Sequence, residues 1–141
     1  MRNDHRGFNP SQINQALILC RLIKRKSKMK KTVMTEWVKA LRSGKFKQGK
    51  KLLKQTDHNG KVSHCCLGVL CEIYNKKNKN KKLNFDNYRF LPTKVMNWCG
   101  LSTYEGRFYD LTKSSSLTAM NDEGKRFTTI ANFIEKEWEK L

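Results

Sequence analysis

The sequence predicts a small single domain of the α+β class, in which a short β-hairpin is packed by several short helices. The chain has 141 residues, which is enough for one hydrophobic core but not for two. Asn59-Gly60 lies between apolar runs and is a strong hairpin signal. From Phe127 onward, apolar residues recur at helical spacing, so we expect an amphipathic C-terminal helix.

Residues 1–31 form a basic extension with nine Lys or Arg residues and one acid. Ser11 is the expected N-cap of a helix over residues 11–25, which runs into a charged segment typical of a linker. Met29 is also a plausible start of translation. As a hypothesis, residues 1–28 are therefore a translated leader, which mass spectrometry of the natively expressed protein would test.

The globular domain is expected over residues 32–141. It begins with a helix that Thr35 caps and Ser43-Gly44 closes. Short strands near residues 51–56 and 61–66 follow on either side of the Asn-Gly turn. The rest of the domain is expected to be mainly helical, with helices over residues 67–76, 93–98 and 117–120 and from 127, an exposed lysine loop at 75–82, and a strand at 107–111.

The composition favours an anionic partner. Thirty Lys and Arg residues against twelve Asp and Glu give a net charge of +18, which attracts polyanions and raises their encounter rate. The sequence contains no apolar run long enough to span a membrane and no typical signal peptide, so we expect no membrane partner. Five cysteines, two of them adjacent, do not form a closed disulfide framework and favour the cytoplasm.

Several short motifs resemble a group of small uncharacterised proteins from bacteriophages and their hosts. The most distinctive are Cys65-Cys66-Leu67-Gly68-Val69-Leu70-Cys71 and Asn121-Asp122-x-Gly124-x-x-Phe127-x-x-Ile130-Ala131. The resemblance covers about residues 34 to 137. It implies a viral origin, with the bacterial host cell as location, and a shared fold, but it supplies no catalytic residues.

The cysteine block is a candidate for a metal site or a thiol nucleophile, although buried packing explains it better. If the chain held a metal, the ligands would be His64, Cys66, Cys71 and Cys99, or a set that includes His58 or Cys65. We expect no metal and no other cofactor, because no second close ligand pair follows. A nucleophile at Cys65 or Cys66 would need a neighbouring base such as His64. On a strand these two cysteines would point to opposite faces, so at most one would enter the core.

Basic residues interleaved with aromatic ones, together with the lysine loop over residues 76–82, provide phosphate contacts and stacking surfaces. The expected anion-binding residues are Lys45, Lys47, Lys50, Lys51, Lys54 and Arg89, and the expected stacking residues are Phe46, Tyr88 and Phe90. A solvated lysine surface with no ligand is the alternative.

These observations predict a binding protein with no catalytic residues. We expect it to act on nucleic acid or on a host enzyme of nucleic-acid metabolism. One alternative is a host-defence antagonist that sequesters an anionic nucleotide messenger or blocks a defence protein, which requires a pocket lined by the same basic and aromatic residues. A second alternative is a cysteine-dependent enzyme.

Overall fold

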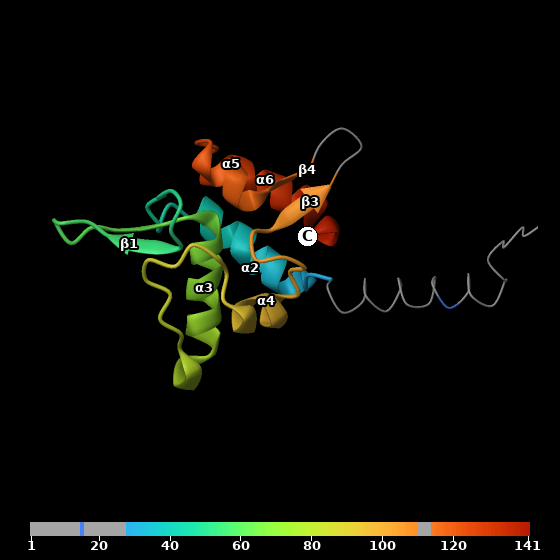
Figure 1. Ribbon diagram of the computed structural model, residues 1–141, viewed down its shortest axis with the longest axis horizontal. Coiled ribbons are helices and arrows are strands. Elements are labelled where there is room, and N and C mark those ends of the chain that lie inside the picture. The colour runs from blue at the N-terminus through green and yellow to red at the C-terminus, as the bar shows by residue number, and fades with distance from the viewer. Residues whose placement is uncertain (1–14, 16–27, 110–113) are drawn as a thin grey trace, which may run out of the picture.

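The computed structural model describes residues 15, 28–109 and 114–141 and shows a mixed α+β domain, as predicted (Figure 1). Helices α2 (Lys31–Arg42), α3 (Cys66–Lys77) and α6 (Phe127–Glu137) contribute most of the buried helical residues, and the shorter helices α4 (Thr93–Cys99) and α5 (Leu117–Asp122) pack against α3. The helix expected over residues 11–25 lies outside the described residues, apart from residue 15.

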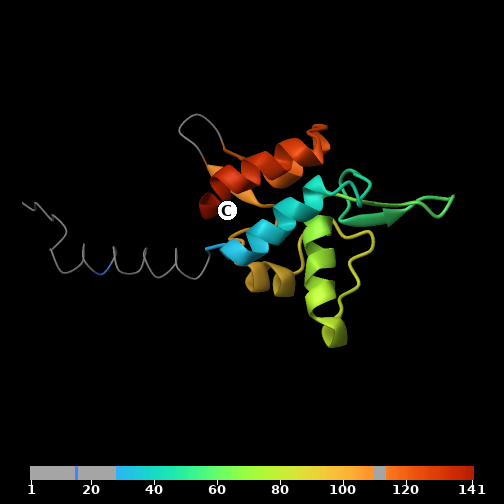
Figure 2. The ribbon, with the colours of Figure 1, turned by 180° about the vertical axis from the view of Figure 1, so that it is seen from behind.

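Helices α2 and α6 pack along each other, as both views show (Figures 1 and 2). Their apolar residues recur at helical spacing, so each helix buries one face. In α2 the helix begins at Lys31, so the prediction that Thr35 caps it is wrong; the Thr35 hydroxyl instead donates to the Lys31 carbonyl, 2.9 Å away. The buried residues are Val33, Met34, Trp37, Val38 and Leu41 of α2 and Phe127, Ile130, Ala131 and Ile134 of α6.

Helix α2 starts early because the residues before it are anchored in the domain. Met29 is buried, and the Lys30 amide donates to the Cys99 carbonyl at 2.9 Å. Gly100 closes α4 with a φ of +85°, as predicted, and an added side chain there would overlap the Lys28 carbonyl. The folded part of the chain therefore includes residues 28–31, slightly more than the predicted domain from residue 32.

Strands β1 (Lys54–Thr56) and β2 (Val62–His64) form the expected antiparallel hairpin, although both are shorter than predicted. They pair Lys54 with His64 and Thr56 with Val62. Directly after β2 the chain enters α3, whose Gly68 lies against the Leu53 backbone; a methyl group at residue 68 would overlap the Leu53 carbonyl. The close contact between helix and hairpin base therefore requires glycine.

The second hairpin joins β3 (Arg107–Tyr109) to β4 (Ser114–Ser116). The strand expected at 107–111 is thus confirmed for its first three residues, and the remaining two lie outside the described residues. The Ser116 hydroxyl accepts from the Ala119 amide at 3.0 Å and caps α5. Helix α6 begins at Phe127, as predicted, and a 3₁₀ turn, η2 (Trp138–Lys140), follows it.

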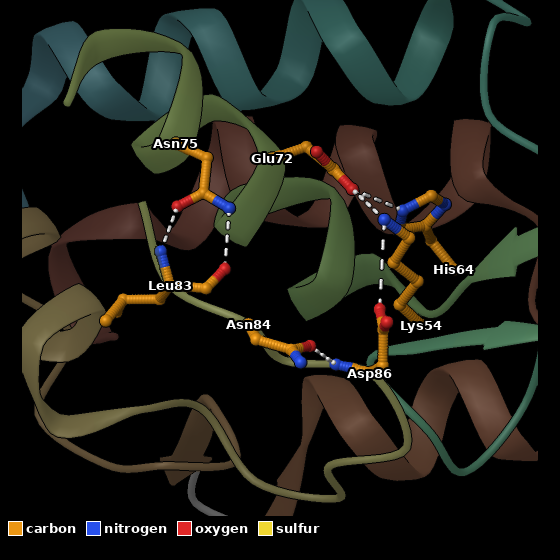
Figure 3. A network of polar contacts seen from close by, with 7 residues as sticks. All are labelled: Lys54, His64, Glu72, Asn75, Leu83, Asn84 and Asp86. Atoms are coloured by element: carbon orange, nitrogen blue, oxygen red, sulfur yellow. Dashed lines mark hydrogen bonds and ion pairs between the residues drawn. The ribbon is translucent and has the colours of Figure 1, made fainter. Parts of the chain in front are cut away.

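The lysine-rich segment after α3 is more ordered than a simple loop. Helix α3 continues to Lys77, and a 3₁₀ turn, η1 (Lys79–Lys81), follows. The Asn75 side chain then holds the returning chain, because its amide accepts from the Leu83 amide at 2.8 Å and donates to the Leu83 carbonyl at 2.9 Å (Figure 3). The lysines of this segment stay exposed, as expected.

Candidate functional site

The base of the β1–β2 hairpin brings together segments that are far apart in the sequence. Gln48 forms a bridge with His64 beside β2, and Asp86 forms a bridge with Lys54 beside β1. The lateral order is therefore residue 48, β2, β1 and residue 86. Beyond this base, residues 55–63, which we call the arm, project from the body of the domain (Figures 1 and 2).

The loop over residues 45–51, which we call the basic loop, carries four of the predicted anion-binding lysines. Lys45, Lys47, Lys50 and Lys51 are exposed, and within the described part of the chain none of them forms an ion pair. Their positive charge is therefore available to a ligand. Lys51 has a φ of 68°, and its amide donates to an Asp122 carboxylate oxygen at 2.8 Å.

A buried hydrogen-bond network fixes the position of the basic loop. Its residues are Gln48, Gly49, Cys66 and Asn121, and we call it the Asn121 network. The fully buried Asn121 side chain accepts from the Cys66 amide at 3.2 Å and from Gln48 Nε2 at 3.1 Å, and it donates to the Gly49 carbonyl at 2.7 Å. Every polar atom of the Asn121 amide is thus used inside the protein.

Gln48 extends this network to the turn between α5 and α6. Its Nε2 donates to the Lys125 carbonyl at 2.7 Å, and its Oε1 accepts from the Phe127 amide at 3.0 Å. Lys125 and Arg126, both exposed, are consequently held beside the basic loop. No local pattern in the sequence indicates these two residues, because their position depends on hydrogen bonds to a residue nearly eighty positions away.

Lys54 occupies a different environment from the other predicted lysines. Its Nζ lies 3.4 Å from a Glu72 oxygen and 3.8 Å from an Asp86 oxygen (Figure 3), and it lies over the Phe85 ring. Two carboxylates therefore neutralise this ammonium group, and Lys54 contributes less to an anion site than the exposed lysines of the basic loop.

Glu72 also binds His64, whose Nε2 lies 2.9 Å from the same carboxylate oxygen (Figure 3). This hydrogen bond lowers the pKa of Glu72; burial opposes the shift, and the nearby Lys54 charge supports it. The His64 ring is buried and lies edge-on to Phe46, with ring centroids 5.3 Å apart. His64 and Glu72 together stabilise the junction between the hairpin and α3.

The predicted stacking residues are divided between two environments. Phe46 is half-buried against the core and His64, whereas Tyr88 and Phe90 expose 52% and 55% of their surface. Arg89, between them, is exposed as well. The Tyr88 carbonyl accepts from the Leu53 amide at 2.7 Å, so this segment runs beside the end of the basic loop.

Tyr104 adds an exposed aromatic ring that the sequence did not single out. The Leu91 amide donates to the Tyr104 carbonyl at 3.3 Å, which places this residue next to the segment with Tyr88 and Phe90. Tyr104 exposes 46% of its surface. The position of Tyr104 beside the predicted stacking residues follows only from the backbone hydrogen bond between the two segments.

The cysteines of the distinctive block are packed inside the domain. Cys65 and Cys66 are both buried, so the expectation that at most one of them enters the core is wrong. The reason is that the strand ends at His64 and the helix begins at Cys66, so the alternation of a strand no longer applies.

Burial raises the pKa of each described cysteine thiol. The pKa of Cys99 rises to about 11, and the pKa values of Cys65, Cys66 and Cys71 rise as well. Backbone N–H groups at the start of α3 oppose the shift at Cys65 and Cys66, but desolvation dominates. These environments disfavour the thiolate that a nucleophile requires.

Three of the four residues that we considered as metal ligands use their polar atoms elsewhere, and the fourth, Cys71, is buried. The Cys66 thiol donates to the Leu117 carbonyl and the Cys99 thiol donates to the Met96 carbonyl, while His64 binds Glu72. Among the described residues, no group of three or more His, Cys, Asp or Glu side chains is arranged to hold a metal ion.

A cavity of about 350 Å³ lies beside the lysine-rich turn after α3. Lysines of the predicted lysine loop over residues 76–82 line it, but none of the predicted residues at 45–54 or 88–90 does. The lining residues are Glu72, Asn75, Lys76, Lys79 and Lys82. The cavity therefore lies apart from the basic loop but adjoins the base of the hairpin, where Glu72 contacts Lys54 and His64.

Comparison with known families identifies the domain but no activity. Residues 29–138 match the family described as domain of unknown function DUF8296. The chain belongs to this family. No curated protein and no solved structure matches the chain significantly. The match begins at the buried Met29 and includes the basic loop, the arm and the Asn121 network.

Over the described residues, every helix is too short or too polar to cross a lipid bilayer.

Proposed function

We propose that the domain binds nucleic acid through the end of the molecule that carries the basic loop. The observation that carries the proposal is the convergence of exposed cations from two separate segments. The basic loop contributes Lys45, Lys47, Lys50 and Lys51, and the turn between α5 and α6 contributes Lys125 and Arg126. The phosphate backbone of nucleic acid is a polyanion that such a surface attracts.

The exposed aromatic residues favour nucleic acid over a generic acidic partner. Tyr88 and Phe90 flank the exposed Arg89, and this segment is joined by a backbone hydrogen bond to Leu53, two residues after Lys51. Aromatic rings and guanidinium groups stack on exposed bases, whereas a carboxylate side chain provides no ring for such stacking. In keeping with the resemblance described above, we place this activity in a bacteriophage protein that acts on nucleic acid, or on an enzyme bound to it, inside the bacterial host.

The proposal can be tested by reversing charges in two places. Binding of the full chain to a labelled 20-base-pair DNA of mixed sequence is measured by fluorescence anisotropy at 50 to 300 mM salt. Lys45→Glu/Lys47→Glu/Lys50→Glu should weaken binding at least tenfold and reduce the salt dependence, because each lost phosphate contact lowers the slope by about 0.9.

Lys76→Glu/Lys79→Glu/Lys82→Glu is the matched control, since it changes the net charge equally on the other side of the hairpin base. It should weaken binding much less. Equal losses in both variants would show that only the net charge matters, and an absence of binding by the unmodified chain would refute the proposed function.

The cavity beside the lysine-rich turn favours a second candidate function, the capture of an anionic nucleotide. Lys76, Lys79 and Lys82 line it, and its volume of about 350 Å³ lies within the range of small-molecule pockets. However, Glu72 also lines it, and the C-terminal carbonyls of α3 point a negative dipole at this region. A rise in melting temperature with cyclic dinucleotides, lost in the Lys76/Lys79/Lys82 variant, would support this candidate.

A further inference from the structure

The arm is an extended element that the core does not require. Residues 56–62 are all exposed, and the hairpin projects away from the helices (Figures 1 and 2). An isolated two-stranded hairpin is only marginally stable in water, so its ordered projection needs a structural cause.

The tip of the arm is held rigid by its own backbone and one side chain. The Asp57 carboxylate accepts from the Asn59 amide at 2.8 Å and from the Lys61 amide at 2.9 Å. The Gly60 amide donates to the Asp57 carbonyl, and Gly60 has a φ of +80°. These contacts form a preorganised turn, which reduces the entropy lost on binding.

The turn also determines which groups the arm presents to a partner. Because the Asp57 carboxylate is directed at backbone amides, its negative charge is partly compensated. The remaining exposed side chains are neutral or basic hydrogen-bonding groups and one apolar group, namely Thr56, His58, Asn59, Lys61 and Val62. Amide, hydroxyl and ammonium groups can contact base edges, and a valine methyl can contact the thymine methyl.

The base of the arm is anchored on both sides. On one side Gly49 of the basic loop lies directly against it, since an added Cβ there would lie 2.7 Å from Ser63 Oγ and 3.1 Å from Gln55 Nε2. On the other side the Asn87 amide donates to the Lys54 carbonyl at 2.8 Å. The exposed cations of the basic loop thus lie beside β2, and the segment with Arg89 lies beside β1.

We propose that the arm enters the major groove of duplex DNA, with the basic loop on one bordering phosphate backbone and Arg89 directed toward the other. This inference rests on the proposed function and specifies the form of nucleic acid. The major groove of B-DNA is about 12 Å wide and about 8.5 Å deep and admits a two-stranded β-ribbon. The arm is extended from Lys54 to Asp57, where the turn begins, and these three steps of about 3.3 Å give a reach of roughly 10 Å, comparable to the groove depth.

Other forms of nucleic acid fit the arm less well. The minor groove of B-DNA is only about 6 Å wide, and the major groove of A-form RNA is too narrow for side chains to reach the bases. Single strands would engage the exposed aromatic rings but would leave the arm without a partner. The geometry therefore favours duplex DNA.

The test removes the arm except for its first pair, Gln55 and Ser63. Residues 56–62 are replaced by Asn-Gly, a two-residue turn that closes directly on the Gln55–Ser63 pair. Binding of the full chain and of this variant is compared on a 20-base-pair DNA, on one of its single strands, and on a 20-base-pair RNA. The variant should lose at least tenfold in affinity for duplex DNA and change little on the single strand. Its melting temperature provides the check that the fold is intact.

Two controls test how much of the loss comes from the charge of the arm and which groove the arm occupies. Lys61→Ala in the intact arm should reduce the logarithm of the affinity for duplex DNA by less than half as much as the shortened variant does. Methyl green, which occupies the major groove, should compete with the full chain, whereas the minor-groove ligand netropsin should not.

Each result decides between the two proposals. Undiminished duplex binding by the shortened variant, or binding to single strands alone, would overturn the arm inference while the nucleic-acid function stands. Competition by netropsin in place of methyl green would do the same. A full chain that binds none of the three nucleic acids would remove both.

Discussion

The Asn121 network and the arm use polar residues in opposite ways. In the network, the Asn121 amide makes three hydrogen bonds to protein atoms and is fully buried. In the arm, the side chains of His58, Asn59 and Lys61 are exposed. The most distinctive sequence motifs therefore build the domain, whereas the residues with unused binding capacity lie in the less distinctive segments.

The largest expected effect is on the packing of the structural region. Gly68→Ala places a methyl group on the Leu53 carbonyl. The methyl group is attached directly to the helix backbone and the carbonyl belongs to the backbone of residue 53, so neither group can move aside easily. We expect a loss of about 4 kcal/mol or more in the free energy of unfolding, measured with urea. Gly60→Asn is the control, because nothing lies near an added side chain there and Asn tolerates a positive φ. Equal stability of the two variants would contradict the close contact.

A second prediction concerns the Asn121 network itself. Asn121→Ala removes the partners of the Cys66 amide and the Gly49 carbonyl in a buried environment. The expected loss is about 3 kcal/mol in the free energy of unfolding, because buried groups are left without partners. Asn132→Ala, which changes an exposed amide bonded to Arg42, should have a far smaller effect. A loss in DNA binding at unchanged stability would instead assign Asn121 to the binding surface.

A third prediction concerns the reactivity of the buried thiols. In a Cys20→Ser background at pH 8, Cys99 should react with a thiol reagent about a hundredfold more slowly in the folded protein than in guanidinium, since its pKa rises from 9.0 to about 11. Cys65, Cys66 and Cys71 should also react slowly. Modification of Cys65 or Cys66 faster than in the unfolded chain would restore the cysteine-dependent enzyme as a candidate.

The smallest effect is expected at the junction between the two regions. Glu72 has a lowered pKa in the folded protein because His64 donates a hydrogen bond to it. Its ionised form therefore stabilises the fold above the ordinary carboxyl pKa of 4.5, and this contribution is lost as the pH falls through the lower folded value.

Glu72→Gln should therefore lower the free energy of unfolding by about 1 kcal/mol at pH 6, after allowance for solvent screening, and by less at pH 3. Urea titrations at the two pH values measure the difference. Glu135→Gln, at an exposed carboxylate paired with Arg42, is the control and should show a weaker pH dependence. A Glu72 effect that grows toward pH 3 would have the wrong sign for this interpretation.

Local signals in the sequence predicted much of the fold. Asn59-Gly60 located the hairpin, Gly100 the end of α4 and Phe127 the start of α6, because each depends on residues close in the chain. The predicted start of α2 was wrong because a backbone hydrogen bond from Lys30 to Cys99 anchors the residues before the helix. No local pattern indicates a contact over that separation.

The candidate site was less predictable for the same reason. The lysines of the basic loop were identified because they alternate with aromatic residues, but the positions of Lys125 and Arg126 beside them depend on the side chain of Gln48. The position of Tyr104 depends on a backbone hydrogen bond from Leu91. Lys54 looked equivalent to the other lysines, although Glu72 and Asp86 bind it in the folded domain. Long-range contacts thus determine which cations are available to a ligand and which are neutralised by carboxylates.

The exposure of residues 56–62 has a consequence for how sequences of this family can vary. The core lies outside these positions, and the turn depends chiefly on Asp57 and Gly60. Substitutions at 56, 58, 59, 61 and 62 can therefore accumulate at little cost in stability. Recognition and foldability can then change independently, so a library randomised at these five positions would sample new targets on an unchanged scaffold.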